Sequence, residues 1–100
     1  MAKLRAIVWS AEAESDLFEI RAFIAGESPH YAEVVAARLY DAVGRLAAFP
    51  ESGRIVPEIS DPHIREVIYG PYRLVYELRV GRIEILTVFR SERDFPRIRD

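Results

Sequence analysis

The chain has 100 residues, of which 50% are hydrophobic, and a net charge of −2. This length allows one small domain with a single core, spanning residues 1–100, and excludes a second domain. No run approaches the roughly 20 apolar residues of a membrane-spanning helix, and the N-terminus lacks a signal-like segment, so we expect a soluble, cytoplasmic protein. The absence of cysteine excludes disulfides, thiolate nucleophiles and cysteine-based zinc sites.

The charged residues are unevenly distributed. Residues 10–49 hold seven acidic residues against three arginines, whereas residues 50–100 hold nine of each sign. Nucleic-acid binding by bulk attraction needs an excess of basic charge, so direct contact with nucleic acid is not expected outside a few placed arginines. His30 and His63 have no ligand-like spacing, and we expect neither a metal site nor a cofactor.

The first half of the chain predicts a strand and two helices. Residues 4–9 are apolar and β-branched, as in a strand, and Ser10 is a good N-cap for a helix over 11–26 that Gly26 closes. Ser28 and the proline after it begin a second helix, whose apolar stripe runs to residue 49. The break between the helices is short, which predicts an antiparallel helical hairpin.

The second half predicts a loop followed by three strands. Residues 50–63 hold three prolines and a glycine and are expected to form an irregular crossing loop. From residue 64 the hydrophobic period changes to two, with turns at Gly70 and Gly81 joining three strands that end near Arg90. The charged tail beyond Arg90 is expected to fray or to await a partner.

These elements predict an α+β fold in the order β-α-α-β-β-β. An antiparallel sheet would carry the N-terminal helical hairpin packed on one face, because each helix has a single apolar stripe to bury. The other face of the sheet would be only partly covered. A domain of this size with one open face would depend on a partner for part of its stability.

Residues 65–76 carry the most informative local pattern, with arginines and tyrosines interleaved among aliphatic residues of a β-hairpin. Arg65, Arg73 and, from the last strand, Arg90 are proposed to converge on the sheet as a target-binding surface for something anionic or planar. Neutralising one of them should lower activity and leave the fold intact. The alternative is an ordinary amphipathic hairpin whose arginines face water. No catalytic constellation stands out in the sequence, so no catalytic residue is assigned.

Three segments together resemble the RelE/ParE superfamily of type II toxin–antitoxin toxins. They are residues 46–54, with a Phe-Pro-x-Ser-Gly-Arg signature, the hairpin 65–76, with a Tyr-Arg-x-x-Tyr signature, and the last strand, 83–90. The resemblance covers nearly the whole chain. It implies a cytoplasmic toxin that is neutralised by a cognate antitoxin, such as a ribbon-helix-helix or similar DNA-binding protein.

The resemblance also implies roles for two of the arginines. Arg73 matches the arginine of the Tyr-Arg-x-x-Tyr strand, which in the nuclease branch contacts the scissile phosphate. Arg90 falls where many relatives carry a histidine, so the natural acid or base of the nuclease branch is missing. This departure and the acidic net charge favour the ParE-like branch.

We therefore expect a ParE-like toxin that inhibits DNA gyrase when it is free of antitoxin, by binding rather than as an enzyme. A ribosome-dependent mRNA endonuclease of the RelE type, using Arg73, Arg90 and a tyrosine, is the alternative. A third possibility is an inactive toxin homologue that persists as a binding module. Plasmid stabilisation is the biological setting that the resemblance suggests.

Overall fold

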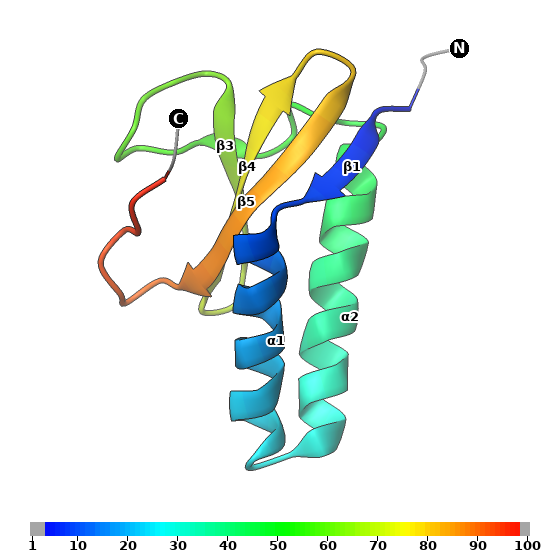
Figure 1. The fold of residues 1–100 in the computed structure, drawn as a ribbon, viewed down its shortest axis with the longest axis vertical. Helices are drawn as coiled ribbons and strands as arrows, with labels where there is room; N and C mark the ends of the chain where they lie inside the picture. Colours follow the sequence, from blue (N-terminus) through cyan, green and yellow to red (C-terminus); the bar gives the residue numbers. More distant parts are fainter. Residues whose placement is uncertain (1–3, 99–100) are drawn as a thin grey trace.

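A computed structural model describes residues 4–98 as two helices and a five-stranded sheet. The helices lie side by side and antiparallel in one layer, and the sheet forms the other (Figure 1). The α+β class and the helical hairpin are therefore confirmed. Neither helix within these residues is long and apolar enough to cross a membrane. The elements in chain order are β1 (Ala6–Trp9), α1 (Ala11–Ala25), α2 (Pro29–Leu46), β2 (Arg54–Ile55), β3 (Ile64–Tyr69), β4 (Tyr72–Arg79) and β5 (Arg82–Arg90).

Both helices begin where their capping residues predict. The Ser10 hydroxyl accepts a hydrogen bond from the N–H three residues on, at 3.0 Å, and the Ser28 hydroxyl does the same at 3.1 Å. These bonds satisfy amide groups that have no partner within the helix. The second helix ends at Leu46, earlier than expected, so Phe49 leaves the apolar stripe and is 65% exposed.

The sheet has the strand order β1-β5-β4-β3-β2. Strands β3, β4 and β5 pair antiparallel, as predicted, and β2 adds to β3 in the same sense, but β1 pairs parallel with β5, so the sheet is mixed. A parallel pair requires a long crossover connection, which the helical hairpin and the rest of the chain provide. The short β2 lies inside the segment 50–63 that was expected to be irregular.

A β-bulge interrupts the pairing of β4 with β5. Tyr76 pairs with Ile85 and Val75 pairs with Thr87, so Leu86 has no partner in β4. An extra residue in one strand reverses the alternation of side chains beyond it, because side chains in a strand alternate between faces. At the end of β5, each side chain therefore lies on the opposite face of the sheet from the one that a regular alternation predicts.

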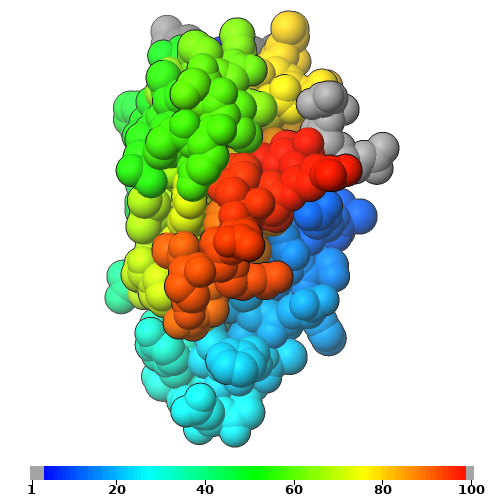
Figure 2. Space-filling model, turned by 90° about the vertical axis from the view of Figure 1, so that its left-hand side faces the viewer, coloured from blue at the N-terminus to red at the C-terminus, as the bar shows by residue number. Residues whose placement is uncertain are grey.

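Both faces of the sheet are covered. One face packs on the helices in the main core, which includes Leu17, Leu39 and Tyr76. On the other face a second cluster forms around Val75 and neighbouring apolar residues, against which Phe95 and Ile98 of the tail and part of the 56–64 segment pack. Figure 2 shows the tail, in red, lying against this segment, in green. The expectations of an open face and a fraying tail are thus wrong for residues 91–98.

Candidate functional site

Arg73 lies on the face of the sheet away from the helices, and its side chain is only 10% exposed. Its Nε donates to Glu66 Oε1 at 2.6 Å, and its two terminal nitrogens donate to the two carboxylate oxygens of Glu58, each at 2.8 Å. The guanidinium carbon lies 5.3 Å from the ring centre of Phe89 and 5.2 Å from that of Phe95. Strands β3 and β5, a loop and the tail therefore all hold this one side chain.

Two arginines and two glutamates alternate here, and we refer to Arg54, Glu58, Glu66 and Arg73 as the Arg73 cluster. The Glu66 side chain is fully buried, and its second oxygen accepts from Arg54 Nε at 2.6 Å. The hydrogen bonds from Arg73 lower the pKa of Glu58 to about 2. Hydrogen bonds to Glu58 and Glu66 in turn raise the pKa of Arg73. The cluster is neutral overall, and Glu58 and Glu66 already engage four of the five N–H donors of Arg73.

Arg65 has a different role from the one expected. Its Nε donates to the carbonyl of Pro62 at 3.0 Å, and its Nη1 donates to the carbonyls of Gly53 at 3.0 Å and Glu51 at 3.3 Å. A guanidinium presents several donors in a planar fork, which suits it to gather carbonyl groups from different segments. Arg65 thus connects the beginning and the end of the segment between α2 and β3 through hydrogen bonds.

Arg90 lies next to the turn of the β3–β4 hairpin, whereas Arg65 lies toward the other end of that hairpin. The Arg90 side chain is on the helix side of the sheet. Its side chain is 41% exposed, and its Nε lies 3.0 Å from both carboxylate oxygens of Glu92. This pairing raises the pKa of Arg90 and lowers that of Glu92. The guanidinium carbon also lies 5.7 Å from the ring centre of Tyr72.

Two adjoining hollows, of about 230 Å³ and about 510 Å³, meet at Arg90. Both are lined by Phe23, Tyr72 and Arg90, and the larger one also includes Tyr31. Phe23 is 69% exposed and Tyr31 is 51% exposed, so aromatic surface lies open to solvent beside a cation. We call Phe23, Tyr31, Tyr72 and Arg90 the aromatic hollow. A surface of this kind suits contact with a protein partner.

The expected convergence of Arg65, Arg73 and Arg90 does not occur. Arg73 pairs with Phe89 and Arg90 with Tyr72, so the last two arginines point to opposite faces of the sheet. The cause is the bulge at Leu86, because without the extra residue Arg73 and Arg90 would share a face. Arg65 lies at the opposite end of β3 from the turn and is occupied by backbone carbonyls.

Sequence reasoning missed the two glutamates and the two phenylalanines that surround Arg73. Alternation along the hairpin places Glu66 and Arg73 on one face, so the pattern itself contained a signal for this pair. Glu58 and Phe95 lie in irregular segments, where no periodicity marks which residues return to the sheet.

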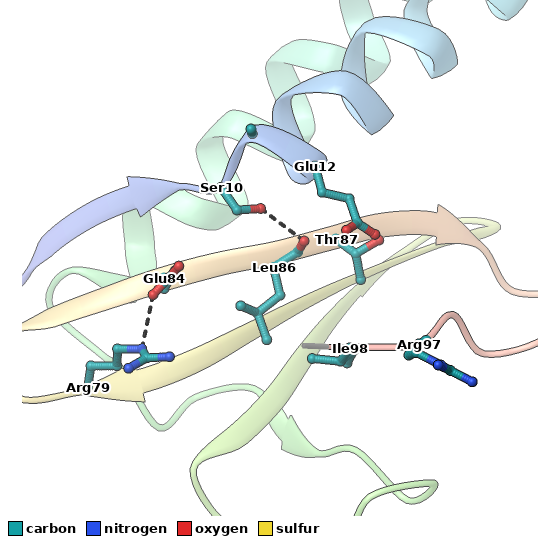
Figure 3. A pocket seen from close by; sticks show the side chains of 9 residues that line it. Ser10, Glu12, Arg79, Glu84, Leu86, Thr87, Arg97 and Ile98 are labelled. Carbon is teal, nitrogen blue, oxygen red and sulfur yellow. Dashed lines mark hydrogen bonds and ion pairs between the residues drawn. The ribbon is translucent and has the colours of Figure 1, made fainter. Parts of the chain in front are cut away.

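A third hollow, of about 280 Å³, lies at the start of α1 (Figure 3). Ser10 donates to the carbonyl of Leu86 at 3.0 Å, and Arg79 Nε lies 3.0 Å from Glu84 Oε1. Its lining combines two arginines with two glutamates, so it offers no surface of a single charge sign. Among residues 4–98, no three histidine, aspartate or glutamate side chains are grouped as a metal site requires.

Comparison of the sequence with known proteins identifies a single family of toxins. Residues 7–95 match the model of the ParE toxin of the type II toxin–antitoxin system parDE. The chain is 34% identical over 88 residues to Toxin RelE2 of Caulobacter vibrioides, an alignment that covers 87% of this chain and 96% of the relative. It is also 34% identical over 93 residues to the putative toxin Y4kP of Sinorhizobium fredii, covering 92% and 94%.

The fold is similar to a solved structure described as the chromosomal ParDE TA system from P. aeruginosa. The TM-score is 0.73 at 20% sequence identity, and the match covers 91% of this chain and all of the other. At this identity the likeness concerns the fold. The sequence matches extend over most of the chain, and on that basis it belongs to the ParE toxin family of type II toxin–antitoxin systems.

Proposed function

We propose that this toxin acts by binding and inhibiting DNA gyrase in the cytoplasm, and that a cognate DNA-binding antitoxin neutralises it. The observation that carries the proposal is the environment of Arg73, whose donors are already engaged by Glu58 and Glu66. A nuclease requires a cation that can reach the transition-state phosphorane. An arginine that two carboxylates hold in place is poorly suited to that role.

The position of the histidines supports the same conclusion. General acid–base catalysis on RNA needs a proton carrier near the reacting phosphate, and histidine is the side chain best suited to it near neutral pH. His30 lies in α2 and His63 lies in the loop before β3, so neither belongs to a strand of the sheet. The last strand ends instead in Arg90, whose side chain cannot serve as a base.

We further propose that the aromatic hollow contacts the target. The side chain of Arg90 is 41% exposed, compared with 10% for Arg73, and Phe23 and Tyr31 provide apolar area beside it. Arg65 and Arg73 would then support the fold of the hairpin and the loops, and affect the target only indirectly.

A ribosome-dependent mRNA endonuclease remains the second candidate, because one relative that is 34% identical is named Toxin RelE2. Two assays with the purified chain separate the candidates. Gyrase inhibition is expected to appear as loss of DNA supercoiling, and added antitoxin should abolish it. Cleavage of ribosome-bound mRNA without any effect on supercoiling would assign the chain to the nuclease branch, and activity in neither assay would indicate an inactive homologue.

Antitoxin binding would also stabilise the toxin. A partner that binds only the folded state raises the melting temperature, by an amount that grows with the logarithm of its concentration relative to its dissociation constant. We expect an interface of about 1,600 Å² or more, as is usual for stable complexes. A melting temperature that does not change when antitoxin is added would contradict this part of the proposal.

A further inference from the structure

The β-bulge at Leu86 determines which side chains at the end of β5 face the helices. Ile83 and Ile85 pack in the main core, and the next residue of β5 in that core is Val88, three positions further on. In a regular strand the next such residue would be at position 87, because side chains alternate between the two faces. Arg90 follows Val88 by two positions, so its place in the aromatic hollow depends on the bulge.

The chain just after β1 provides hydrogen-bond partners for the bulged segment. Strand β1 ends at Trp9, opposite Ile85, and within residues 4–98 no other strand continues along that side of β5. The N–H of Ser10 donates to the carbonyl of Ile85 at 3.0 Å, and its hydroxyl donates to the carbonyl of Leu86 at 3.0 Å (Figure 3). The backbone of β5 thus passes from pairing with a strand to bonding with the start of α1, at the position of the extra residue.

Asp16, in the second turn of α1, bonds to the two residues that follow the extra one. Its Oδ2 accepts a hydrogen bond from the Thr87 hydroxyl at 2.6 Å and another from the N–H of Val88 at 3.0 Å. Thr87 is 3% exposed and Val88 is 2% exposed, so solvent has little access to these donors. Buried donors are nearly always paired within the protein. Ser10 therefore holds the backbone before the bulge, and Asp16 holds it after the bulge.

The bonds to Asp16 matter because the location of a bulge is not fixed by its presence. Between Ile85 and Arg90, β5 contains one residue more than the paired segment of β4. A bulge that moved beyond Arg90 would turn this side chain to the face that carries Arg73, because each position that the bulge passes changes face. Burial of Val88 in the core favours the present location as well, so an experiment has to separate the two contributions.

We propose that Asp16 is a positioning residue, which fixes the bulge at Leu86 and thereby keeps Arg90 in the aromatic hollow. The placement of Arg90 concerns the free toxin. Its consequence for inhibition rests on the proposed function, in which Arg90 contacts the target. Asp16 also lines the smaller hollow beside Arg90, so a direct contact of Asp16 with the target has to be distinguished from this indirect role. Thr87 allows the distinction, because a side chain that is buried does not contact a partner.

NMR of the ¹⁵N,¹³C-labelled chain tests the placement of Arg90. In the parent chain the Arg90 side chain should show nuclear Overhauser effects to the Tyr72 ring, whose centre lies 5.7 Å from the guanidinium carbon. Asp16→Ala should remove these effects. It should also speed exchange of the Val88 amide at least about tenfold relative to the amide of Leu39, a buried residue of α2. The reference amide corrects for any change in global stability.

Two further substitutions in α1 provide the comparison. Asp16→Asn keeps a side-chain oxygen that can accept from the N–H of Val88, so it should retain the Overhauser effects and change the relative exchange rate less than about threefold. Glu14→Ala removes an exposed carboxylate from the same helix and should change neither measurement. Parent-like data for Asp16→Ala would show that burial of Val88 fixes the bulge by itself, and would overturn the proposal. So would equal effects of Asp16→Ala and Glu14→Ala.

Inhibition of gyrase separates the indirect role of Asp16 from a direct one. Thr87→Val removes the hydroxyl bond to Asp16 at a buried position, and it should weaken inhibition at least about threefold, whereas Thr87→Ser, which keeps the hydroxyl, should not. Full inhibition by Thr87→Val, together with loss of inhibition by Asp16→Ala, would assign Asp16 a direct contact and overturn the positioning role. If the parent chain does not inhibit gyrase, the proposed function fails, while the NMR comparison still decides whether Asp16 positions Arg90.

Discussion

Arg73 and Arg90 lie on opposite faces of the sheet although they belong to neighbouring strands, because Arg73 pairs with Phe89 and Arg90 with Tyr72. The two side chains therefore have separate surroundings. Arg73 joins the sheet to a loop and to the tail, whereas Arg90 presents a cation beside exposed aromatic side chains. The effects of mutating them should differ in kind.

Arg73→Ala should lower the free energy of unfolding by about 3–5 kcal/mol, because it leaves the buried Glu66 carboxylate short of a partner. Arg73→Lys should recover only part of this loss, since an ammonium group lacks the planar fork that reaches both glutamates. Urea denaturation measures the change. Arg38→Ala, at an exposed helical site, is the control and should change stability by less than about 0.5 kcal/mol. A similarly small change for Arg73→Ala would show that the Arg73 cluster contributes little to the free energy of unfolding.

Stability should fall in acid as Glu58 takes up a proton. Its pKa is lowered from an ordinary value of 4.5 to about 2 by the hydrogen bonds from Arg73, so below pH 4.5 the unfolded state binds the proton first. The contribution is complete above pH 4.5 and is lost as the pH falls to about 2. Because the Glu58 side chain is 42% exposed, solvent screening limits the effect to about 1 kcal/mol.

Replacing Glu58 by glutamine tests this pH dependence. The Glu58→Gln variant should show a flatter fall in the free energy of unfolding between pH 4.5 and pH 2 than the parent chain does. Urea titrations at several pH values within that window provide the measurement. Identical slopes for both proteins would mean that Arg73 does not hold the Glu58 carboxylate in solution.

Phe95→Ala should destabilise the chain by about 1–3 kcal/mol, because the ring packs against Phe89, with centres 5.4 Å apart, and against the Arg73 guanidinium. Thermal unfolding measures the loss. Arg93→Ala, an exposed position in the same tail, serves as the control and should have little effect. If the two substitutions had the same small effect, the tail would not be held on the sheet in solution.

Two glycine substitutions should act in opposite directions. A Cβ at Gly53 would lie 2.6 Å from the Glu66 carbonyl oxygen and 2.7 Å from the Tyr76 hydroxyl, so Gly53→Ala should be clearly destabilising. A Cβ at Gly44 in α2 would meet nothing within 4 Å, and Gly44→Ala should stabilise the chain by about 0.5–1 kcal/mol. Melting temperatures that move in the same direction for both variants would contradict this account.

Arg90→Ala should reduce toxicity and leave stability nearly unchanged. One charge-assisted contact contributes about 1.5–3 kcal/mol, so half-maximal inhibition of gyrase should require at least about tenfold more protein. Arg82→Ala is a matched control, because Arg82 lies in the same strand and its side chain is 47% exposed. Equal inhibition by the two variants would remove Arg90 from the target-binding surface.

Local features of the fold could be predicted from the sequence, whereas its long-range pairings could not. Ser10 and Ser28 mark the helix starts because a cap and its helix are adjacent in the chain. The bulge at Leu86 and the return of Phe95 to the sheet depend on segments that meet only in three dimensions. The bulge therefore separated Arg73 from Arg90, although the strands that carry them were predicted correctly.

The pairing of β1 with β5 has a consequence for how the toxin is made. Ala6 and Ile7 leave the ribosome well before their partners Arg82 and Ile83 have been synthesised. Contacts between such distant segments form late and slow the folding of a domain. The sheet is thus incomplete while the chain is being synthesised. A partner already present in the cell therefore has the whole period of translation to reach the nascent toxin before it can act.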